Sequence, residues 1–569
     1  MHNIHDSQTA HGAQAPHAKP FMRWFTRLLA VVLAMGAGYL QACSIAAPWS
    51  GQPLWWLQIL SLAVLAALVQ WASSAKSAAL LGWLFATSWL TGSTWWLYIS
   101  MHDYGGLDSQ LAAGAVLALS GALALYYAIA CGFYRRYSPP ARAKPAQAAI
   151  IFAAVWLFAE LARDTWFTGF PWGAGGYAHV DGFLAGYAGR VGVYGIGFLA
   201  TVAAALLASA TYARAPKAVG LAVLRLAVMA GVLVAGVSGT WLGEPASESG
   251  QAVTVSLLQG NIPQGEKFDN SKGIPFALDW YAQQLKASTA TLVIAPETAI
   301  PLLPQQLPED YWQKLKDRFE KSSAKGKSPQ AALVGIPLGS YQDGYTNSVI
   351  GLQPTSLPGA QNVMQPQPYR YDKHHLVPFG EFIPRFFKWF TQMMNIPLGD
   401  FSRGAIGQPS FDFAGQRWAP NICYEDLFGD ELAARFKDPA TAPTVMVNIS
   451  NIGWFGNSIA IDQHLHISRM RALELGRPML RATNTGPTAI IDHRGVVTAS
   501  LPRHSLGVLT GTVEARSGMT LYAQWASRLG HWPLWLLAIV ITAWAFLRRV
   551  PRDASGRRQN SQFKASSSF

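Results

Sequence analysis

The sequence predicts two structural units, an α-helical polytopic membrane domain of about eight spans and an α/β layered domain placed before the last span. Two observations predict the membrane unit. Half of the 569 residues are hydrophobic and only 13% are charged, and apolar runs recur at close to the roughly 20 residues that a helix needs to cross a bilayer. A third observation predicts the α/β unit, because region 245–528 alternates short apolar strands with polar or amphipathic segments.

The apolar runs define the expected spans. Each run is long enough for a transmembrane helix and carries few charged residues, although the fifth has Glu160 and Arg163 near its end. We expect the spans at 28–47, 54–72, 78–99, 111–134, 147–163, 190–210, 218–240 and 532–547.

Lysine and arginine residues predict the orientation of the spans. Basic residues precede the first span, crowd the loop 135–144 and follow the last span, whereas the loops 48–53 and 100–110 have none. The positive-inside rule then places both termini in the cytoplasm and region 245–528 on the outer side, which in a bacterium is the periplasm. The formal charge of +13 is explained by this topology, so we do not expect a nucleic-acid partner.

These observations divide the chain into five expected segments of an inner-membrane protein. They are a disordered tail at 1–20, a transmembrane domain of about seven spans at 21–244, a periplasmic catalytic domain at 245–528, a transmembrane helix at 529–550 and a cytoplasmic tail at 551–569.

Within the α/β unit, six apolar runs are typical of strands and three amphipathic runs are typical of helices. A hairpin is expected where 488–492 and 496–500 flank a short turn that contains Gly495. The expected strands are 253–258, 291–295, 331–336, 348–352, 418–422 and 444–449, and the expected helices are 276–287, 309–321 and 461–475.

Cysteine placement points to a nucleophile. Cys43 and Cys131 lie inside apolar runs, so Cys423 has no disulfide partner in its own domain. It follows the strand-like run 418–422 and precedes Glu425. A cysteine attacks an acyl carbon as its thiolate, so a base must take the proton and a positive or hydrogen-bonding group must hold the oxyanion.

Two earlier stretches offer those groups. Glu297 ends a buried-strand pattern, and we expect burial to raise its pKa toward the range of a general base. Lys373 offers a positive charge for the thiolate and the oxyanion, and Glu381 and Glu425 are expected to position these groups or share the proton transfer. Taken singly, each residue also fits an ordinary role as a solvated carboxylate, a surface lysine or an inert buried thiol. Their joint occurrence favours a site.

The three stretches together resemble the carbon–nitrogen hydrolase (nitrilase) superfamily. The matches are Ala-Pro-Glu-Thr at 295–298, the run 371–381 and Ile-Cys-Tyr-Glu at 422–425. The resemblance implies an αββα sandwich and a catalytic triad of Glu297, Lys373 and Cys423, with Tyr424 among the supporting residues.

A nitrilase-like domain on a polytopic membrane domain further resembles the apolipoprotein N-acyltransferase family of the bacterial inner membrane. That resemblance implies an acyl transfer from a membrane phospholipid, through a thioester, to the α-amino group of a diacylglyceryl-cysteine of an apolipoprotein. It implies no cofactor. Supporting stretches are 259–264, 451–458 with Trp454 as a substrate contact, His464, 471–474, 481–486 and Gly-Phe-Pro-Trp at 169–172.

The chain departs from the family pattern at two positions. Ile452 stands where an acidic residue is usual, and Phe268 is the nearest aromatic residue to a position where tryptophan is usual. Both departures concern the substrate side of the pocket and leave the triad intact.

An aromatic run between Lys373 and Cys423 is the candidate for a lid that faces the membrane. Aromatic residues with an interspersed Lys388 suit a helix at the bilayer interface, although an ordinary amphipathic helix packed on the domain fits the pattern equally well. The lid residues are Phe386, Phe387, Trp389 and Phe390.

Other functions fit the sequence less well. The pairs His374-His375 and His464/His466 lack a third ligand at zinc-like spacing, so no metal site is expected. A membrane-tethered amidase acting on a small soluble amide is the alternative enzyme, but it gives no reason for a lid that faces lipid. A transporter would require intramembrane charges around a site at the bilayer midplane, whereas the residues suited to catalysis lie outside the spans.

Overall fold

The computed structural model describes residues 20–210, 220, 231, 247–320, 329–340, 342–354, 368–383 and 401–548. Several expectations therefore lie outside the described residues. These are the C-terminal tail and nearly all of the N-terminal tail, the span 218–240 except for two glycines, and the lid residues Phe386, Phe387, Trp389 and Phe390.

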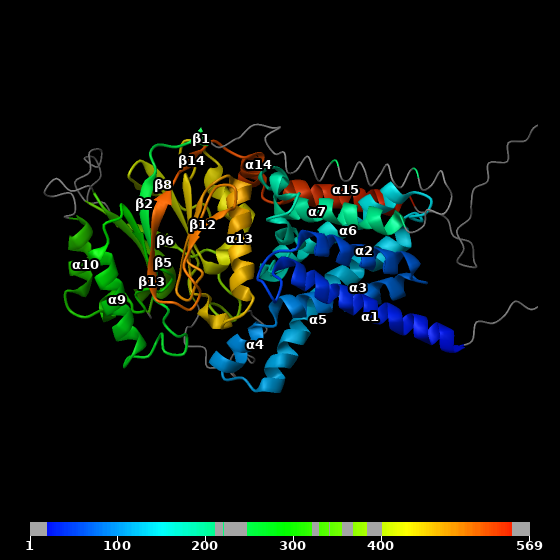
Figure 1. Ribbon diagram of the computed structural model, residues 1–569, viewed down its shortest axis with the longest axis horizontal. Helices are drawn as coiled ribbons and strands as arrows, with labels where there is room; N and C mark the ends of the chain where they lie inside the picture. The colour runs from blue at the N-terminus through cyan, green and yellow to red at the C-terminus, as the bar shows by residue number, and fades with distance from the viewer. Residues whose placement is uncertain are drawn as a thin grey trace, which may run out of the picture.

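Helices occupy the seven expected spans that the described residues include. Figure 1 shows them as a bundle beside the sheets, with α15 packed along α6. The helices are α1 (Pro20–Ile45), α2 (Trp55–Trp71), α3 (Ala75–Thr94), α5 (Ser109–Tyr137), α6 (Pro145–Thr165), α7 (Ala188–Ala210) and α15 (Trp532–Leu547), with the short α4 (Leu97–Ile99) after α3.

The predicted count of about eight spans is not confirmed by these helices. Four of them are long and apolar enough to cross a membrane, namely those within Trp24–Ile45, Ser109–Tyr137, Pro145–Thr168 and Ala185–Ala210. A fifth arises if α14 (Leu521–Leu529) and α15, which meet at a bend of 84°, form one broken span. The 17 residues of α2 rise only about 26 Å, which is less than the roughly 30 Å of a bilayer core.

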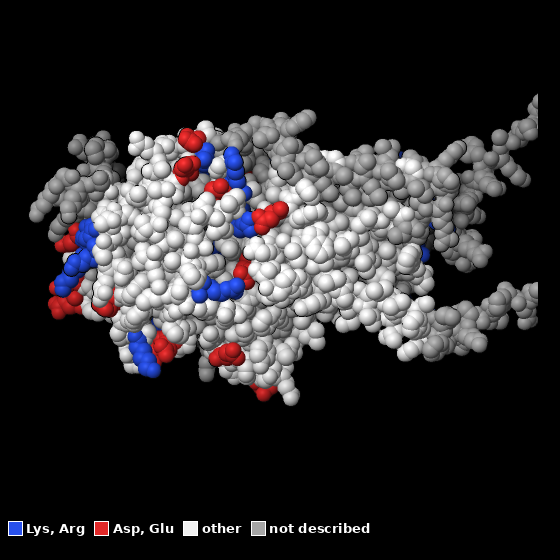
Figure 2. All heavy atoms as spheres, viewed as in Figure 1, with Lys and Arg blue, Asp and Glu red and all other residues white. Residues whose placement is uncertain are grey.

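Charge is distributed unevenly over the two units. Figure 2 shows lysine, arginine, aspartate and glutamate side chains over the α/β unit and its boundary, while the visible face of the helical bundle is nearly free of them. Large apolar side chains on that bundle are exposed, among them Trp24, Leu117 and Ile129. An apolar surface of this kind is suited to contact with lipid.

The α/β unit contains two six-stranded sheets, and all six predicted strands are confirmed. One sheet has the order β13-β2-β3-β4-β5-β6 and the other has the order β12-β11-β10-β9-β8-β7. The first comprises β2 (Val253–Gln259), β3 (Leu292–Ile294), β4 (Ala331–Ser340), β5 (Gly344–Leu352), β6 (Tyr369–Asp372) and β13 (Gly507–Val513). The second comprises β7 (Phe411–Phe413), β8 (Gln416–Ile422), β9 (Val445–Ser450), β10 (Met479–Thr483), β11 (Ala489–Ile491) and β12 (Val497–Ser500).

The pairing directions place the ends of several strands at one edge. Strands β2, β3 and β4 are parallel to one another, as are β8, β9 and β10. The predicted hairpin is confirmed as the antiparallel pair β11 and β12. A small ribbon joins β1 (Ser247–Glu248) to β14 (Arg516–Ser517).

Apolar packing arranges these elements in four layers, α–β–β–α. The two sheets face each other through a buried core that includes Leu257, Leu333, Trp418 and Val447. Each side chain of this size contributes about 1.5–3 kcal/mol when it is removed from water. The outer layers are α9 (Gly273–Ala287) and α10 (Tyr311–Glu320) on one side, and α12 (Gly429–Ala433), α13 (Ala460–Leu475) and α14 on the other.

Helix α13 also docks the α/β unit onto the helical bundle. The Gln463 Oε1 atom accepts hydrogen bonds from the indole nitrogens of Trp96, at 3.1 Å, and Trp172, at 2.7 Å. At its far end, the Glu474 carboxylate accepts a 2.6 Å bond from the Val193 amide. Trp172 belongs to the Gly-Phe-Pro-Trp stretch at 169–172, so that motif joins the two units.

Replacing Gln463 with leucine is expected to loosen this docking. The variant leaves the buried Trp172 indole N–H without its acceptor, which costs about 1–3 kcal/mol, whereas the Trp96 indole keeps a 2.8 Å bond to the Ser93 carbonyl oxygen. Thermal unfolding of the full-length chain in detergent should show a lower midpoint than for the unchanged protein. The exposed Gln524→Leu change serves as the control, and equal midpoints for the two variants would contradict the docking role.

Candidate active site

Strand ends from both sheets bring the predicted triad into one place. Glu297 follows β3 and Lys373 follows β6 in one sheet, while Cys423 follows β8 in the other. Glu297 and Lys373 form an ion pair, and both charges act on the Cys423 thiol. The three residues that the sequence singled out therefore share one site.

Lys373 lies between two carboxylates in the buried interior. Its Nζ atom is 2.8 Å from Glu381 Oε1 and 3.4 Å from Glu297 Oε1, and its side chain is 1% exposed. The Asn347 amide nitrogen donates to the same two oxygens, at 2.7 Å to Glu297 and 2.8 Å to Glu381. The predicted positioning role of Glu381 thus has a direct geometric basis.

The expectation that the pKa of Glu297 rises is wrong. Burial does act to raise it, but the positive charges of Lys373 and Lys267 and hydrogen bonds from Asn347 and Asn451 outweigh burial and hold the pKa below its usual value. The backbone amide of Asn451 donates to Glu297 Oε2 at 2.8 Å. The resting site therefore holds Glu297 as a carboxylate, ready to accept a proton.

The thiol of Cys423 is held in its neutral form. Burial raises its pKa, the Glu297 carboxylate raises it further, and Lys373 opposes both, which leaves the pKa at about 12. Cys423 also adopts a positive φ of 53°, a conformation that costs a residue with a side chain about 1–2 kcal/mol. Such a turn directs the side chain away from the line of β8.

His464 helps to hold that turn. Arg481 Nη2 lies 3.2 Å from His464 Nδ1, and a guanidinium can only donate, so Nδ1 accepts and the ring proton sits on Nε2. The Nε2 atom is 3.1 Å from the Cys423 carbonyl oxygen and donates to it. Burial and the Arg481 charge keep the pKa of His464 well below its usual value, which is consistent with a neutral ring.

Glu425 ties the lysine loop to the cysteine strand. One of its oxygens accepts from the backbone amides of His374, at 2.6 Å, and His375, at 3.2 Å. The other accepts from the Ile422 amide, at 2.6 Å, and the Tyr371 hydroxyl, at 2.8 Å. Each of the four donors lies one or two positions from Lys373 or Cys423 in the sequence. Glu425 therefore holds the backbone around Lys373 and Cys423, although it forms no ion pair with Lys373.

Three polar residues of the site were not predicted to act in it, although one of them, Asn451, lies in the supporting stretch 451–458. They are Asn347 in β5, Asn451 after β9, and Lys267, whose Nζ donates to the Glu297 carbonyl oxygen at 3.0 Å. Burial lowers the pKa of Lys267 to about 8. Two features of the sequence could have pointed to them. Lys267 lies close to the stretch 259–264 and Asn347 lies within an apolar strand, but neither feature is specific to a catalytic site.

Two predicted residues face the helical bundle. The Tyr424 hydroxyl donates to the Gly169 carbonyl at 3.3 Å. The Trp454 ring, in the short helix η9 (Ile452–Phe455), meets the Tyr104 ring edge-on with centroids 5.9 Å apart. Both therefore lie at the junction of the two units.

The candidate histidines bond to protein groups. His374 Nδ1 is 2.7 Å from the Gly404 carbonyl, His375 Nδ1 is 3.0 Å from a Glu431 oxygen, and His466 Nε2 is 2.7 Å from the Gly51 carbonyl. In the part of the chain that the structure describes, no three His, Cys, Asp or Glu side chains form a group suited to hold a metal ion.

Charge substitutions should move the pKa of the Cys423 thiol in opposite directions. Glu297→Gln removes a negative neighbour and is expected to lower it, whereas Lys373→Met removes a positive neighbour and is expected to raise it. Thiolate absorbance during a pH titration, in a background where Cys43 and Cys131 are alanine, measures both changes. A shift of the same sign in the two variants would refute the assigned charge pattern.

Comparisons with known proteins agree with this architecture. Residues 37–206 match the family described as Apolipoprotein N-acyltransferase N-terminal domain, and residues 254–520 match the family described as Carbon-nitrogen hydrolase. The apolipoprotein N-acyltransferase of Verminephrobacter eiseniae is 54% identical over 546 residues, which is 92% of this chain and 97% of that protein.

More distant relatives cover the chain almost as fully. The apolipoprotein N-acyltransferase of Ralstonia nicotianae is 44% identical and covers 87% of this chain and 90% of its own length. That of Bordetella bronchiseptica is 43% identical, with coverage of 89% and 94%. Identity at this level over nearly the whole length means that this chain belongs to the apolipoprotein N-acyltransferase family.

Proposed function

We propose that this chain completes lipoprotein maturation by moving an acyl chain from a membrane phospholipid to the α-amino group of the diacylglyceryl-cysteine of an apolipoprotein. Membership of the family supports the reaction class. The observation that carries the mechanism is the convergence of Glu297, Lys373 and Cys423 in one buried site. The alternative, an amidase acting on a small amide, is not favoured by that membership.

The first half-reaction forms a thioester on Cys423. The Cys423 proton passes to the Glu297 carboxylate as the sulfur attacks the ester carbonyl carbon of the phospholipid. Lys373 stabilises the oxyanion that develops. When the tetrahedral intermediate collapses, the carbon–oxygen ester bond breaks, Glu297 returns the proton to the leaving alkoxide, and a lysophospholipid departs.

The second half-reaction transfers the acyl chain to the amine. The neutral α-amino group attacks the thioester carbonyl, Glu297 takes the proton that the new amide nitrogen loses, and the carbon–sulfur bond breaks. The proton then returns to the departing Cys423 sulfur. Because a thioester is reactive enough to acylate an amine, no nucleotide is needed, and the order of events is ping-pong.

Lys267 supplies a second positive charge to the site. Its ammonium group is buried and touches the backbone of Glu297, and it acts with Lys373 to keep that carboxylate ionised. We assign Lys267 an electrostatic role. Among the described residues its ammonium group donates to the backbone carbonyl oxygen of Glu297 and not to the Glu297 carboxylate.

The membrane arrangement follows from the substrates. Donor and acceptor are both anchored in lipid, so the proposed reaction requires a site near the bilayer surface, and the docking of α13 on the helical bundle supports that placement. We place the catalytic domain, 245–528, in the periplasm, and we place about seven spans in 21–244 and one more in 529–550. The aromatic run 386–390 remains the proposed lid and Trp454 a proposed substrate contact.

Detection of the acyl-enzyme tests the reaction. The purified full-length chain, mixed with phospholipid that carries a labelled acyl chain, should acquire a hydroxylamine-sensitive adduct on the Cys423 peptide in mass spectrometry. Addition of a diacylated lipopeptide should then remove the adduct and yield a labelled amide.

Cysteine variants control this experiment. Cys423→Ala should abolish the adduct and the transfer, whereas Cys131→Ala should retain both because its thiol is buried in the helical bundle. Label found only as free fatty acid, or an adduct that persists in Cys423→Ala, would refute the acyltransferase mechanism.

The pH profile tests the role of Lys267. With a pKa of about 8, Lys267 is charged below that pH and neutral above it, so kcat/KM should decline as the pH rises through about 8. In Lys267→Met this alkaline decline should be lost. Because the Lys267 charge lowers the pKa of Glu297, the acid limb of the profile should also move to higher pH. If the Lys267→Met profile has the same shape as that of the unchanged protein and kcat/KM is lower by the same factor at every pH, Lys267 has a purely structural role.

A further inference from the structure

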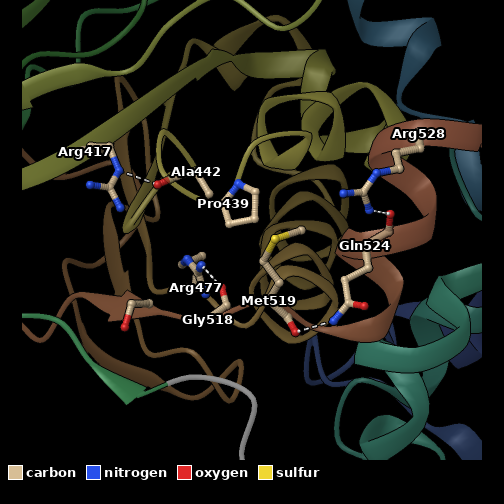
Figure 3. Close-up of a pocket in the computed structure, with 9 residues that line it drawn as sticks. Arg417, Pro439, Ala442, Arg477, Gly518, Met519, Gln524 and Arg528 are labelled. Atoms are coloured by element: carbon tan, nitrogen blue, oxygen red, sulfur yellow. Dashed lines mark hydrogen bonds between the residues drawn. The ribbon is translucent and has the colours of Figure 1, made fainter.

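Three arginines surround a cavity that the proposed chemistry does not use. The cavity has a volume of about 370 Å³ and lies beside β8, the segment that precedes β9, β14 and α14. Figure 3 shows Arg417, Arg477 and Arg528 reaching it from different elements. Arg417 and Cys423 stand six positions apart along β8, which corresponds to about 20 Å of strand. The cavity is therefore separate from the catalytic site.

The most buried of these arginines has no carboxylate partner in the part of the chain that the structure describes. Arg477 is 1% exposed and donates to the carbonyl oxygens of Pro443, at 2.6 Å, Gly476, at 3.0 Å, and Gly518. These acceptors are neutral. Burial and the Arg417 charge lower the pKa of Arg477 to about 10. An enclosed positive charge is costly unless an anion compensates it.

The other two arginines also keep donors free for a ligand. Arg417 uses Nε to bond the Ala442 carbonyl at 2.6 Å, and Arg528 uses Nη1 to bond the Gln524 carbonyl at 3.0 Å. Among the described residues none of the three arginines forms an ion pair, although Asp412 lies opposite Arg417 in the strand pairing and feels its charge. A guanidinium has five N–H donors, so several remain for a doubly coordinated oxyanion such as phosphate.

The position of α14 indicates where that phosphate comes from. The helix forms one wall of the cavity and bends by 84° into the apolar helix α15. Leu521, Leu529 and Trp532, at the ends of α14 and the start of α15, are 55%, 52% and 64% exposed. Figure 1 shows α14 at the boundary of the sheet domain and the helical bundle. An amphipathic helix with apolar side chains exposed at such a boundary is suited to a bilayer surface.

We propose that this cavity binds the headgroup phosphate of an anionic phospholipid, at a site distinct from the one that supplies the acyl chain. Three guanidinium groups with free donors match a net negative phosphodiester, and α14 holds them at the level of the lipid headgroups. The bound lipid fixes the catalytic domain against the membrane through α14. This inference rests on the proposed membrane placement of the chain and not on its acyl-transfer chemistry.

Native mass spectrometry of the full-length chain in detergent tests the proposal. Phosphatidylglycerol should remain bound to the unchanged protein, and the Arg417→Gln/Arg528→Gln double variant should bind it about 30-fold more weakly, at about 1 kcal/mol for each arginine. The difference should shrink as salt is added. Arg477 is left unchanged because its three backbone bonds hold the fold. The matched control is Lys314→Gln/Lys316→Gln on α10, which removes the same charge elsewhere.

The arms of the experiment separate the alternatives. Phosphatidylcholine should show no difference between the double variant and the control, and inorganic phosphate alone should bind more weakly than phosphatidylglycerol. Equal binding of phosphatidylglycerol by the double variant and the unchanged protein would overturn the site. Inorganic phosphate that binds as tightly as the lipid would overturn the lipid assignment. An unfolding midpoint of the double variant in detergent that equals that of the control shows that it is folded and keeps this test independent of the proposed reaction.

Discussion

The balance of charge inside a buried site is the constraint on which the rest of this structure depends. Two lysines, Lys373 and Lys267, lie with two glutamates, Glu297 and Glu381, in the protein interior. These positive and negative groups lie close enough to offset one another, and such pairing lowers the cost of burying charged side chains. Ionisation of Cys423 would add another negative charge to this site, and burial first and the Glu297 charge second raise its pKa.

The two-sheet architecture makes that balance possible. The groups of the site come from strand ends in both sheets, and hydrogen bonds cross between the sheets at the same edge. The Asn451 amide, after β9, donates to Glu297, after β3, and the Tyr371 hydroxyl, in β6, donates to Glu425, after β8. The apolar core between the sheets sets their separation. Packing therefore determines the distances on which the electrostatics depend.

The sequence predicted what local pattern controls and missed what assembly controls. The strands that deliver Glu297 and Cys423 are apolar runs, so their ends could be located from periodicity. Strand β10 escaped because Arg481 interrupts its apolar pattern, yet that side chain is buried against Asp426. The predicted direction of the Glu297 pKa shift is wrong. Burial follows from the run of apolar residues before Glu297, but Lys267 and Asn451, which lower the pKa, approach from distant parts of the chain. The predicted span 54–72 is also longer than α2, Trp55–Trp71, because it includes flanking residues that lie outside the helix.

A neutral resting thiol is an advantage for an unpaired cysteine on the outer side of a membrane, where we place it. The thiolate, and not the thiol, reacts with oxidants and with other disulfides. With a pKa of about 12, Cys423 carries almost no thiolate at neutral pH. In the proposed reaction the nearby carboxylate takes the proton only as sulfur attacks, so reactivity appears together with the ester substrate. If the proposed mechanism holds, the electrostatics that suppress the free thiolate protect the nucleophile between turnovers, and they make Glu297 indispensable in each proposed half-reaction.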